Sequence, residues 1–146
     1  MEKLPPEFSE FLRLLARHDV KHMVIGGYAV AYYGYSRFTA DIDIWIEASP
    51  ENADSVLAAL HEFGFDMPDL NREHFIEPGQ ITRMGVPPMR IEILTDIDGV
   101  DFHDCFNAKE SATLENQEIS FISLADLKRN KAASGRAKDL ADLDRL

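Results

Sequence analysis

The sequence contains one cysteine, Cys105, among its 146 residues. A lone cysteine excludes an intrachain disulfide, and no pair of ligands at zinc-finger spacing surrounds it. No segment reaches the ~18 apolar residues of a membrane span, and the opening stretch MEKLPPEFSEF lacks the basic and then apolar run of a secretory signal. We therefore expect a cytoplasmic protein that is neither exported by that route nor embedded in a membrane.

Basic residues are also scarce, with 15 Lys and Arg against 26 Asp and Glu, so the formal net charge is −11. This balance argues against broad attachment to duplex DNA or to an anionic membrane, because both need a basic surface. One local exception is the stretch LKRNKAASGRAK near the C-terminus. The length and the 45% hydrophobic content fit a single soluble globular domain over residues 1–146.

The spacing of apolar residues predicts helices mixed with a small β-sheet, which places the chain in the α+β class. A Ser49 N-cap, Pro50 and Gly64 bracket one of these helices. The segment 65–79 is expected to be a loop. The helices are expected over residues 5–18, 28–34, 50–63, 123–135 and 138–146, and the strands over 20–25, 41–47, 80–86, 89–95 and 118–122.

Two glycines, Gly26 and Gly27, directly follow the first predicted strand. They form either an ordinary tight turn or a site where backbone N–H groups approach a phosphate closely, which a Cβ atom would obstruct. The sequence at this point leaves both interpretations open.

Two aspartates, Asp41 and Asp43, alternate with isoleucines on the next strand and so point to the same face. Like charges on one face repel each other, so they need solvent or a cation such as Mg²⁺, which prefers oxygen ligands. Glu92, on the later strand RIEIL, is a third acid that reaches the same site if the two strands are neighbours. Three such acids are typical of a two-metal site for phosphoryl transfer, although an Asp-x-Asp on a half-exposed strand is common and weak evidence alone.

The segments IGGYAV, RFTADIDIWI, RIEILTDIDGV and NKAASGRAKDLADL together resemble the nucleotidyltransferase superfamily, which has the DNA polymerase beta-like fold. The resemblance is closest to small bacterial members related to the abortive-infection (AbiEii) type IV toxin family, and it extends from about residue 20 to the end. Two positions depart from the usual pattern: Tyr28 where many members have Ser, and Glu92 where many have Asp.

This resemblance implies a nucleotidyltransferase-like fold and a Mg²⁺-dependent enzyme that transfers a nucleoside monophosphate from a nucleoside triphosphate (NTP) to an acceptor hydroxyl, releasing pyrophosphate. It implies that Gly26 and Gly27 hold the phosphates and that Asp41, Asp43 and Glu92 are the metal ligands and catalytic residues. It also implies that the C-terminal motif faces the nucleotide. That motif comprises Lys131, Arg136, Lys138 and Asp139.

Other polar residues are weaker candidates for nucleotide contacts. Arg37 and Thr39 precede the aspartates and either touch the triphosphate or belong to a bare surface loop. Lys131 and Lys138 either lie on a solvated helix face or neutralise bound phosphate. The tyrosines at 28, 32, 33 and 35 are expected to be mainly packing residues, and the alternative role for one of these rings is to stack on a base.

Two other functions remain open from the sequence. One is a non-catalytic nucleotide-binding or regulatory module, such as one half of a toxin–antitoxin pair, and the other is a purely structural interaction domain. The sequence does not specify the acceptor, which is an RNA end, a small antibiotic-like alcohol or a protein side chain, nor the preferred base. It equally leaves open whether the protein forms a homodimer or binds an antitoxin or toxin partner.

Overall fold

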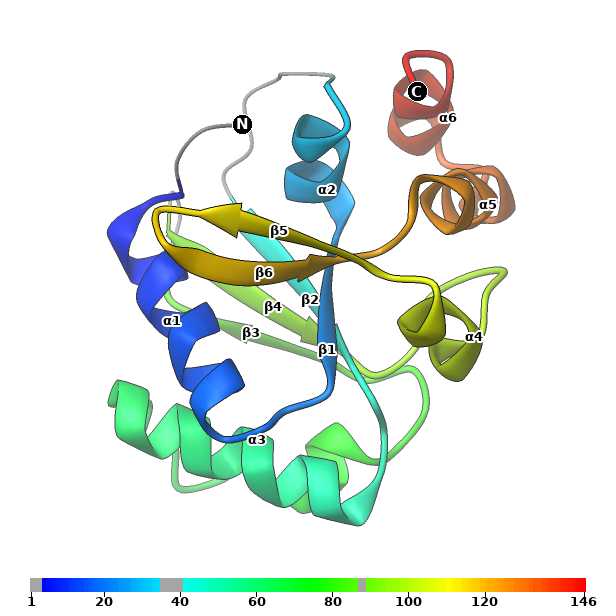
Figure 1. Ribbon diagram of the computed structural model, residues 1–146. Helices are drawn as coiled ribbons and strands as arrows, with labels where there is room; N and C mark the ends of the chain where they lie inside the picture. Colours follow the sequence, from blue (N-terminus) through cyan, green and yellow to red (C-terminus); the bar gives the residue numbers. More distant parts are fainter. Residues whose placement is uncertain (1–3, 35–40, 87–88) are drawn as a thin grey trace.

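The computed structural model describes residues 4–34, 41–86 and 89–146 (Figure 1). The strands form a mixed six-stranded sheet in the order β3-β4-β2-β1-β6-β5, which confirms the predicted α+β class. The strands are β1 His22–Ile25, β2 Asp41–Ile46, β3 Ile81–Met84, β4 Arg90–Leu94, β5 Glu110–Leu114 and β6 Gln117–Phe121. The helices are α1 Pro6–Arg17, α2 Gly26–Tyr32, α3 Pro50–Phe63, α4 Phe102–Asn107, α5 Leu124–Ser134 and α6 Ala137–Leu143, with a 3₁₀ turn, η1, at Arg72–Phe75.

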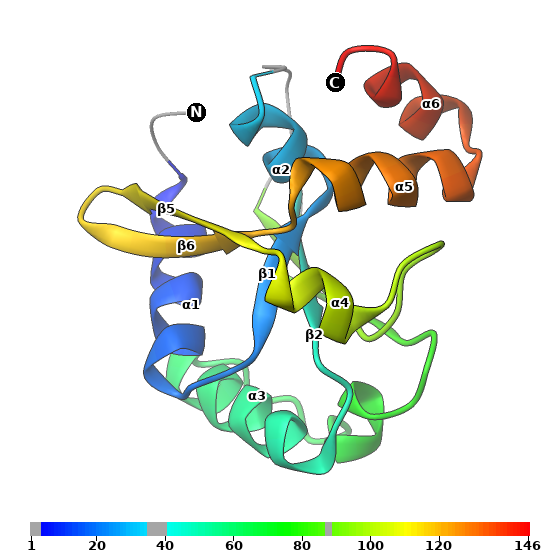
Figure 2. The ribbon, with the colours of Figure 1, turned by 45° about the vertical axis from the view of Figure 1, so that its right-hand side comes forward.

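Helices lie on both sides of the sheet. Figures 1 and 2 show α1 and α3 together on one side, away from α4, α5 and α6. Phe11 of α1 packs edge-on against Phe63 of α3, with ring centroids 5.2 Å apart. The isoleucines of β2 are fully buried in the core, whereas Trp45, at an alternate position of β2, packs against Phe102 of α4. The two faces of β2 therefore belong to different environments, as the alternation predicted.

Strand β2 lies at the centre of the sheet and pairs antiparallel with β1 and parallel with β4. The parallel pair sets Asp41 opposite Arg90 and Asp43 opposite Glu92. Strand β3 pairs antiparallel with β4 and sets Arg83 opposite Glu92. Because residues paired across neighbouring strands point to the same face, this register gathers charged side chains from three strands on one surface.

Most predicted elements are present, with shifted ends. The α3 helix has the predicted boundaries: the Ser49 side chain accepts a hydrogen bond from the Asn52 backbone N–H, and Gly64 has a left-handed conformation with φ of 101°. The start predicted for α2 at residue 28 was wrong, because the helix begins at Gly26. The first strand begins at His22 rather than at residue 20.

Three elements were not predicted: η1 inside the expected loop, α4 and β5. The β5 strand lies at the edge of the sheet and has no fully buried residue, so it lacks an apolar alternation. The feature that points to this strand is the turn between β5 and β6 at Glu115 and Asn116, whose φ values of 52° and 64° are those of a tight hairpin turn. None of the helices in the described residues is long and apolar enough to cross a membrane.

Candidate functional site

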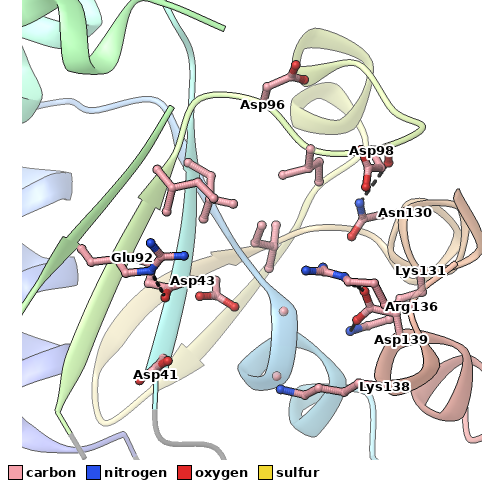
Figure 3. Close-up of a pocket in the computed structure, with 17 residues that line it drawn as sticks. Asp41, Asp43, Glu92, Asp96, Asp98, Asn130, Lys131, Arg136, Lys138 and Asp139 are labelled. Carbon is pink, nitrogen blue, oxygen red and sulfur yellow. Dashed lines mark hydrogen bonds and ion pairs between the residues drawn. The ribbon is translucent and has the colours of Figure 1, made fainter. Parts of the chain in front are cut away.

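A pocket of about 670 Å³ lies between the charged face of the sheet and the two C-terminal helices (Figure 3). One wall carries the acids of β2 and β4, and the opposite wall carries polar residues of α5 and α6. Gly26 and Gly27 line it between these walls, and the loop after β4 contributes Asp96 and Asp98. The pocket thus brings together segments that are more than 100 residues apart in the chain.

The three predicted acids meet in this pocket. Asp41 and Asp43 line it from β2, and Glu92 lines it from the neighbouring strand, directly opposite Asp43. All three side chains are partly buried, and Glu92 has 16% of its side-chain surface exposed. The sequence prediction that Glu92 shares a face with the two aspartates is therefore confirmed in position.

Crowding of these acids changes the ionisation of Asp43. Burial raises the pKa of Asp43 from 3.8 to about 7, and a hydrogen bond with Glu92 and the negative charges of Glu92 and Asp41 add to the rise. The positive charge of Lys138 opposes it. One oxygen of each aspartate, Oδ1 of Asp41 and Oδ1 of Asp43, is buried without a hydrogen-bond partner. Such oxygens are stabilised by a cation, because leaving a buried charged group unpaired is costly.

Two arginines that sequence analysis did not select lie among the acids. Arg90 Nη2 is 2.8 Å from Asp41 Oδ2, and Arg83 Nε is 2.9 Å from Glu92 Oε1. Within the described part of the chain, no group of three or more His, Cys, Asp or Glu side chains is arranged to hold a metal ion. The acids fit a divalent cation in chemical type and two of their buried oxygens have no hydrogen-bond partner, but Asp41 and Glu92 are engaged by guanidinium groups in this structure.

Gly26 has a direct structural reason to be glycine. Its φ of +65° is unfavourable for other residues, and a Cβ atom there would collide with Asp43 Oδ2. The next residue, Gly27, is buried and also lines the pocket. The glycine turn therefore lets the backbone lie against the carboxylate of Asp43.

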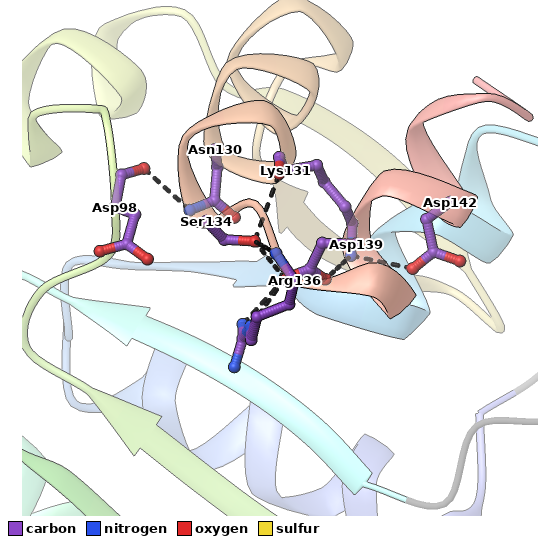
Figure 4. Close-up of polar contacts among 7 residues, drawn as sticks. All are labelled: Asp98, Asn130, Lys131, Ser134, Arg136, Asp139 and Asp142. Carbon is purple, nitrogen blue, oxygen red and sulfur yellow. Dashed lines mark hydrogen bonds and ion pairs between the residues drawn. The ribbon is translucent and has the colours of Figure 1, made fainter.

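Lys131 belongs to a buried polar network between α5 and α6 (Figure 4). Only 4% of the residue is exposed, and its Nζ lies 3.0 Å from both Asp139 Oδ1 and Asp142 Oδ2. Ser134 and Arg136 donate hydrogen bonds to the other oxygen of Asp139. Although burial raises the pKa of Asp139, hydrogen bonds from Ser134 and Lys131 outweigh it and lower the pKa below its ordinary value. Lys131 thus joins two helices, although it also lines the pocket.

Lys138 and Arg136 are the exposed cations of the helical wall. Figure 3 shows both side chains projecting from α6 and the turn before it toward the side of the pocket that carries the acids. The predicted contacts Arg37 and Thr39 lie outside the described residues, as does Tyr35.

The tyrosines of α2 and the tyrosine that follows it are packing residues, as expected. Tyr32 stacks on Phe121 with a centroid distance of 4.2 Å, and the Tyr33 hydroxyl donates a 2.6 Å hydrogen bond to the Ile122 carbonyl. Tyr28 is buried and packs edge-on against Phe8.

The raised pKa of Asp43 predicts a stability that depends on pH. As pH rises from 5 to 8, the unfolded chain is already ionised at Asp43, whereas the folded chain must lose its proton near pH 7. Ionisation of Asp43 therefore lowers the stability of the wild-type protein over this interval, and Asp43→Asn, which cannot ionise, lacks this contribution. The quantity compared is the free energy of unfolding of Asp43→Asn minus that of wild type. We expect this difference to increase by about 2 kcal/mol between pH 5 and pH 8, measured by denaturant unfolding with EDTA present.

Glu118→Gln is the matched control for this measurement, because Glu118 is an exposed carboxylate on β6 outside the pocket. Its stability relative to wild type should not change between the two pH values. A pH-independent difference for Asp43→Asn would show that Asp43 is ionised in the folded protein throughout.

Comparison with known proteins agrees with this fold. The sequence model of the family described as nucleotidyl transferase of unknown function (DUF2204) matches residues 6–146. A search of curated protein sequences finds no match.

Three solved structures show similar folds at low sequence identity. A Thermotoga maritima protein assigned to the nucleotidyltransferases is 19% identical, with a TM-score of 0.65, and the match covers 99% of this chain and 94% of that protein. The lincosamide antibiotic adenylyltransferase LnuA, with lincomycin bound, is 15% identical, with a TM-score of 0.57 over 99% and 96% of the two chains. A nucleotidyltransferase-like antigen from Paracoccidioides brasiliensis is 17% identical, with a TM-score of 0.58 over 93% and 71%.

Proposed function

This chain belongs to the DUF2204 family of nucleotidyl transferases, and from that premise we propose that it transfers a nucleoside monophosphate from an NTP to an acceptor hydroxyl in a Mg²⁺-dependent reaction, releasing pyrophosphate. The observation that carries the proposal is the meeting of Asp41, Asp43 and Glu92 on one wall of a pocket whose other wall carries exposed cations. An acidic wall binds metal, and a cationic wall binds phosphate, so the pocket fits a metal–triphosphate.

The acids are assigned the role of metal ligands. Asp41 and Asp43 offer the buried oxygens that have no hydrogen-bond partner, and Glu92 lies opposite Asp43. Bound Mg²⁺ would activate the attacking oxygen and neutralise the charge that develops on the pyrophosphate. Glu92 is also assigned to accept the proton of the acceptor hydroxyl, because it lies next to the metal-binding aspartates and is partly exposed to the pocket.

The remaining residues bind and orient the nucleotide. Lys138 and Arg136 neutralise phosphate charge, and the backbone at Gly26 and Gly27 approaches it closely. Lys131 holds α6, and with it Lys138, in place. Direct phosphate contacts from Arg37 and Thr39 stay predictions from the sequence.

A small hydroxylated compound is the first acceptor to test. The pocket carries the apolar side chains of Ile81, Leu94 and Ile97, and a second cavity of about 510 Å³ shares Ile81 and Arg83 with it. The net charge of −11 disfavours an RNA acceptor. One protein of similar fold is described as a lincosamide adenylyltransferase with lincomycin bound. A relation to AbiEii toxins, and any antitoxin partner or homodimer, stays a prediction.

The proposal predicts that labelled NTPs will transfer their label. The purified protein is incubated with each α-labelled triphosphate and Mg²⁺, either with lincomycin or with a cell extract, and both acceptor labelling and pyrophosphate are measured. We expect one triphosphate to label an acceptor, with an equal amount of pyrophosphate released and no transfer in EDTA. Nucleotide binding that is the same with and without Mg²⁺, with no pyrophosphate, would instead support the non-catalytic module.

A further inference from the structure

The acids of the pocket are interleaved with arginines in a regular pattern set by the sheet. One row across the strands contains Arg83 of β3, Glu92 of β4 and Asp43 of β2, and the adjacent row contains Arg90 and Asp41. Backbone pairing fixes which residues face one another, so the fold holds these arginines within reach of the acids.

Arg90 is the arginine most closely tied to the acids. Its Nη2 atom is 2.8 Å from Asp41 Oδ2, and its Nε atom is 3.8 Å from Glu92 Oε1. The side chains of Arg90 and Asp41 have 33% and 25% of their surface exposed, so the pair is partly shielded from solvent. Arg90 therefore contacts one oxygen of Asp41 while the other, Oδ1, is buried without a partner.

A guanidinium at this position opposes the binding of a metal ion. It contacts an oxygen that a divalent cation would use, and its positive charge repels the cation at short range. The repulsion weakens when a nucleotide arrives with the metal, because the triphosphate brings compensating negative charge.

We propose that Arg90 is a positioning residue that acts through Asp41: it holds the carboxylate before substrate binds and makes tight metal binding depend on the nucleotide. This inference rests on the proposed function and assigns to the same site an order of events, in which the metal enters together with the triphosphate. On binding of the metal–nucleotide, Arg90 leaves Asp41 Oδ2.

The test measures metal binding without nucleotide. Mn²⁺ takes the same oxygen ligands as Mg²⁺, and its free concentration is read from its electron paramagnetic resonance signal. We expect Arg90→Gln to bind Mn²⁺ at least ~10-fold more tightly than wild type, because a positive charge has been removed beside the ligands. Arg90→Lys, which keeps the charge, should stay close to wild type.

Arg72→Gln is the matched control, since Arg72 forms an ion pair with Asp54 at 2.9 Å outside the pocket. It should leave Mn²⁺ binding unchanged. A general loss of structure would weaken Mn²⁺ binding, so the expected tightening separates the proposal from a merely structural role. Equal or weaker Mn²⁺ binding by a folded Arg90→Gln protein would overturn the inference.

A second measurement uses the wild-type protein and does not depend on the folding of a variant. The side-chain N–H signals of Arg90 and Arg72 are followed by nuclear magnetic resonance during addition of Mg²⁺ with a non-hydrolysable triphosphate. The Arg90 signal should shift and the Arg72 signal should not. If the Arg90 signal does not shift at saturation while label transfer is intact, only the inference about Arg90 is overturned. If the protein neither binds the nucleotide nor transfers the label, the proposed function is overturned as well.

Discussion

Asp43→Asn should lower the rate of nucleotidyl transfer by about 1,000-fold or more while the protein keeps its fold. Asp43 lies at the centre of the acid cluster, between Glu92 on β4 and the glycine turn. An amide cannot supply the negative charge that a metal ligand needs, and loss of electrostatic stabilisation at a phosphoryl-transfer site removes most of the rate gain. The measurement is pyrophosphate release with the triphosphate that the labelling experiment identifies.

Glu118→Gln should retain the wild-type rate, because it makes the same change of carboxylate to amide outside the pocket. The circular dichroism spectra of both variants should match that of wild type. Asp43→Asn is expected to be inactive and, at pH 8, more stable than wild type, which is the pattern of a site whose charges oppose folding but serve function. Transfer at the wild-type rate by this variant would remove Asp43 from the catalytic site.

Lys131→Met should destabilise the protein by about 3–5 kcal/mol, because it removes the cation that lies between two buried carboxylates. Asp139 and Asp142 would each lose a 3.0 Å ion pair, and only 3% of Asp142 is exposed to water. The methionine fills a similar volume, so the loss reflects charge more than packing. The free energy of unfolding is measured by denaturant titration at neutral pH.

Lys128→Met is the matched control, since Lys128 lies on the same helix but is not buried in the network. It should change the unfolding free energy by less than ~0.5 kcal/mol. The double variant Lys131→Met with Asp142→Asn should recover part of the stability, because one of the two buried carboxylates that lost the Lys131 ion pair is then neutral. If Lys131→Met were as stable as wild type and had lost only nucleotide affinity, Lys131 would be a direct phosphate ligand, as the sequence resemblance implied.

Several features of the fold followed from short stretches of sequence. The α3 helix was predictable at both ends because Ser49, Pro50 and Gly64 act through local backbone geometry and hydrogen bonds. The shared face of Asp41 and Asp43 was predictable because a strand turns its side chains to alternate sides. The β5 strand could not be recognised in the same way, since an exposed edge strand has no buried face to impose a pattern.

The sequence by itself determined which acids this protein has and the face of the strand to which each points, because these depend on neighbours along the chain. Only the tertiary structure decided that β4 lies parallel to β2, and so that Arg90 stands beside Asp41 and Arg83 beside Glu92. It also decided that Lys131 is paired in a buried network while Lys138 faces the pocket. These contacts join residues distant in sequence, and an ion pair depends on the separation of charges in space, which the order of residues along the chain does not fix.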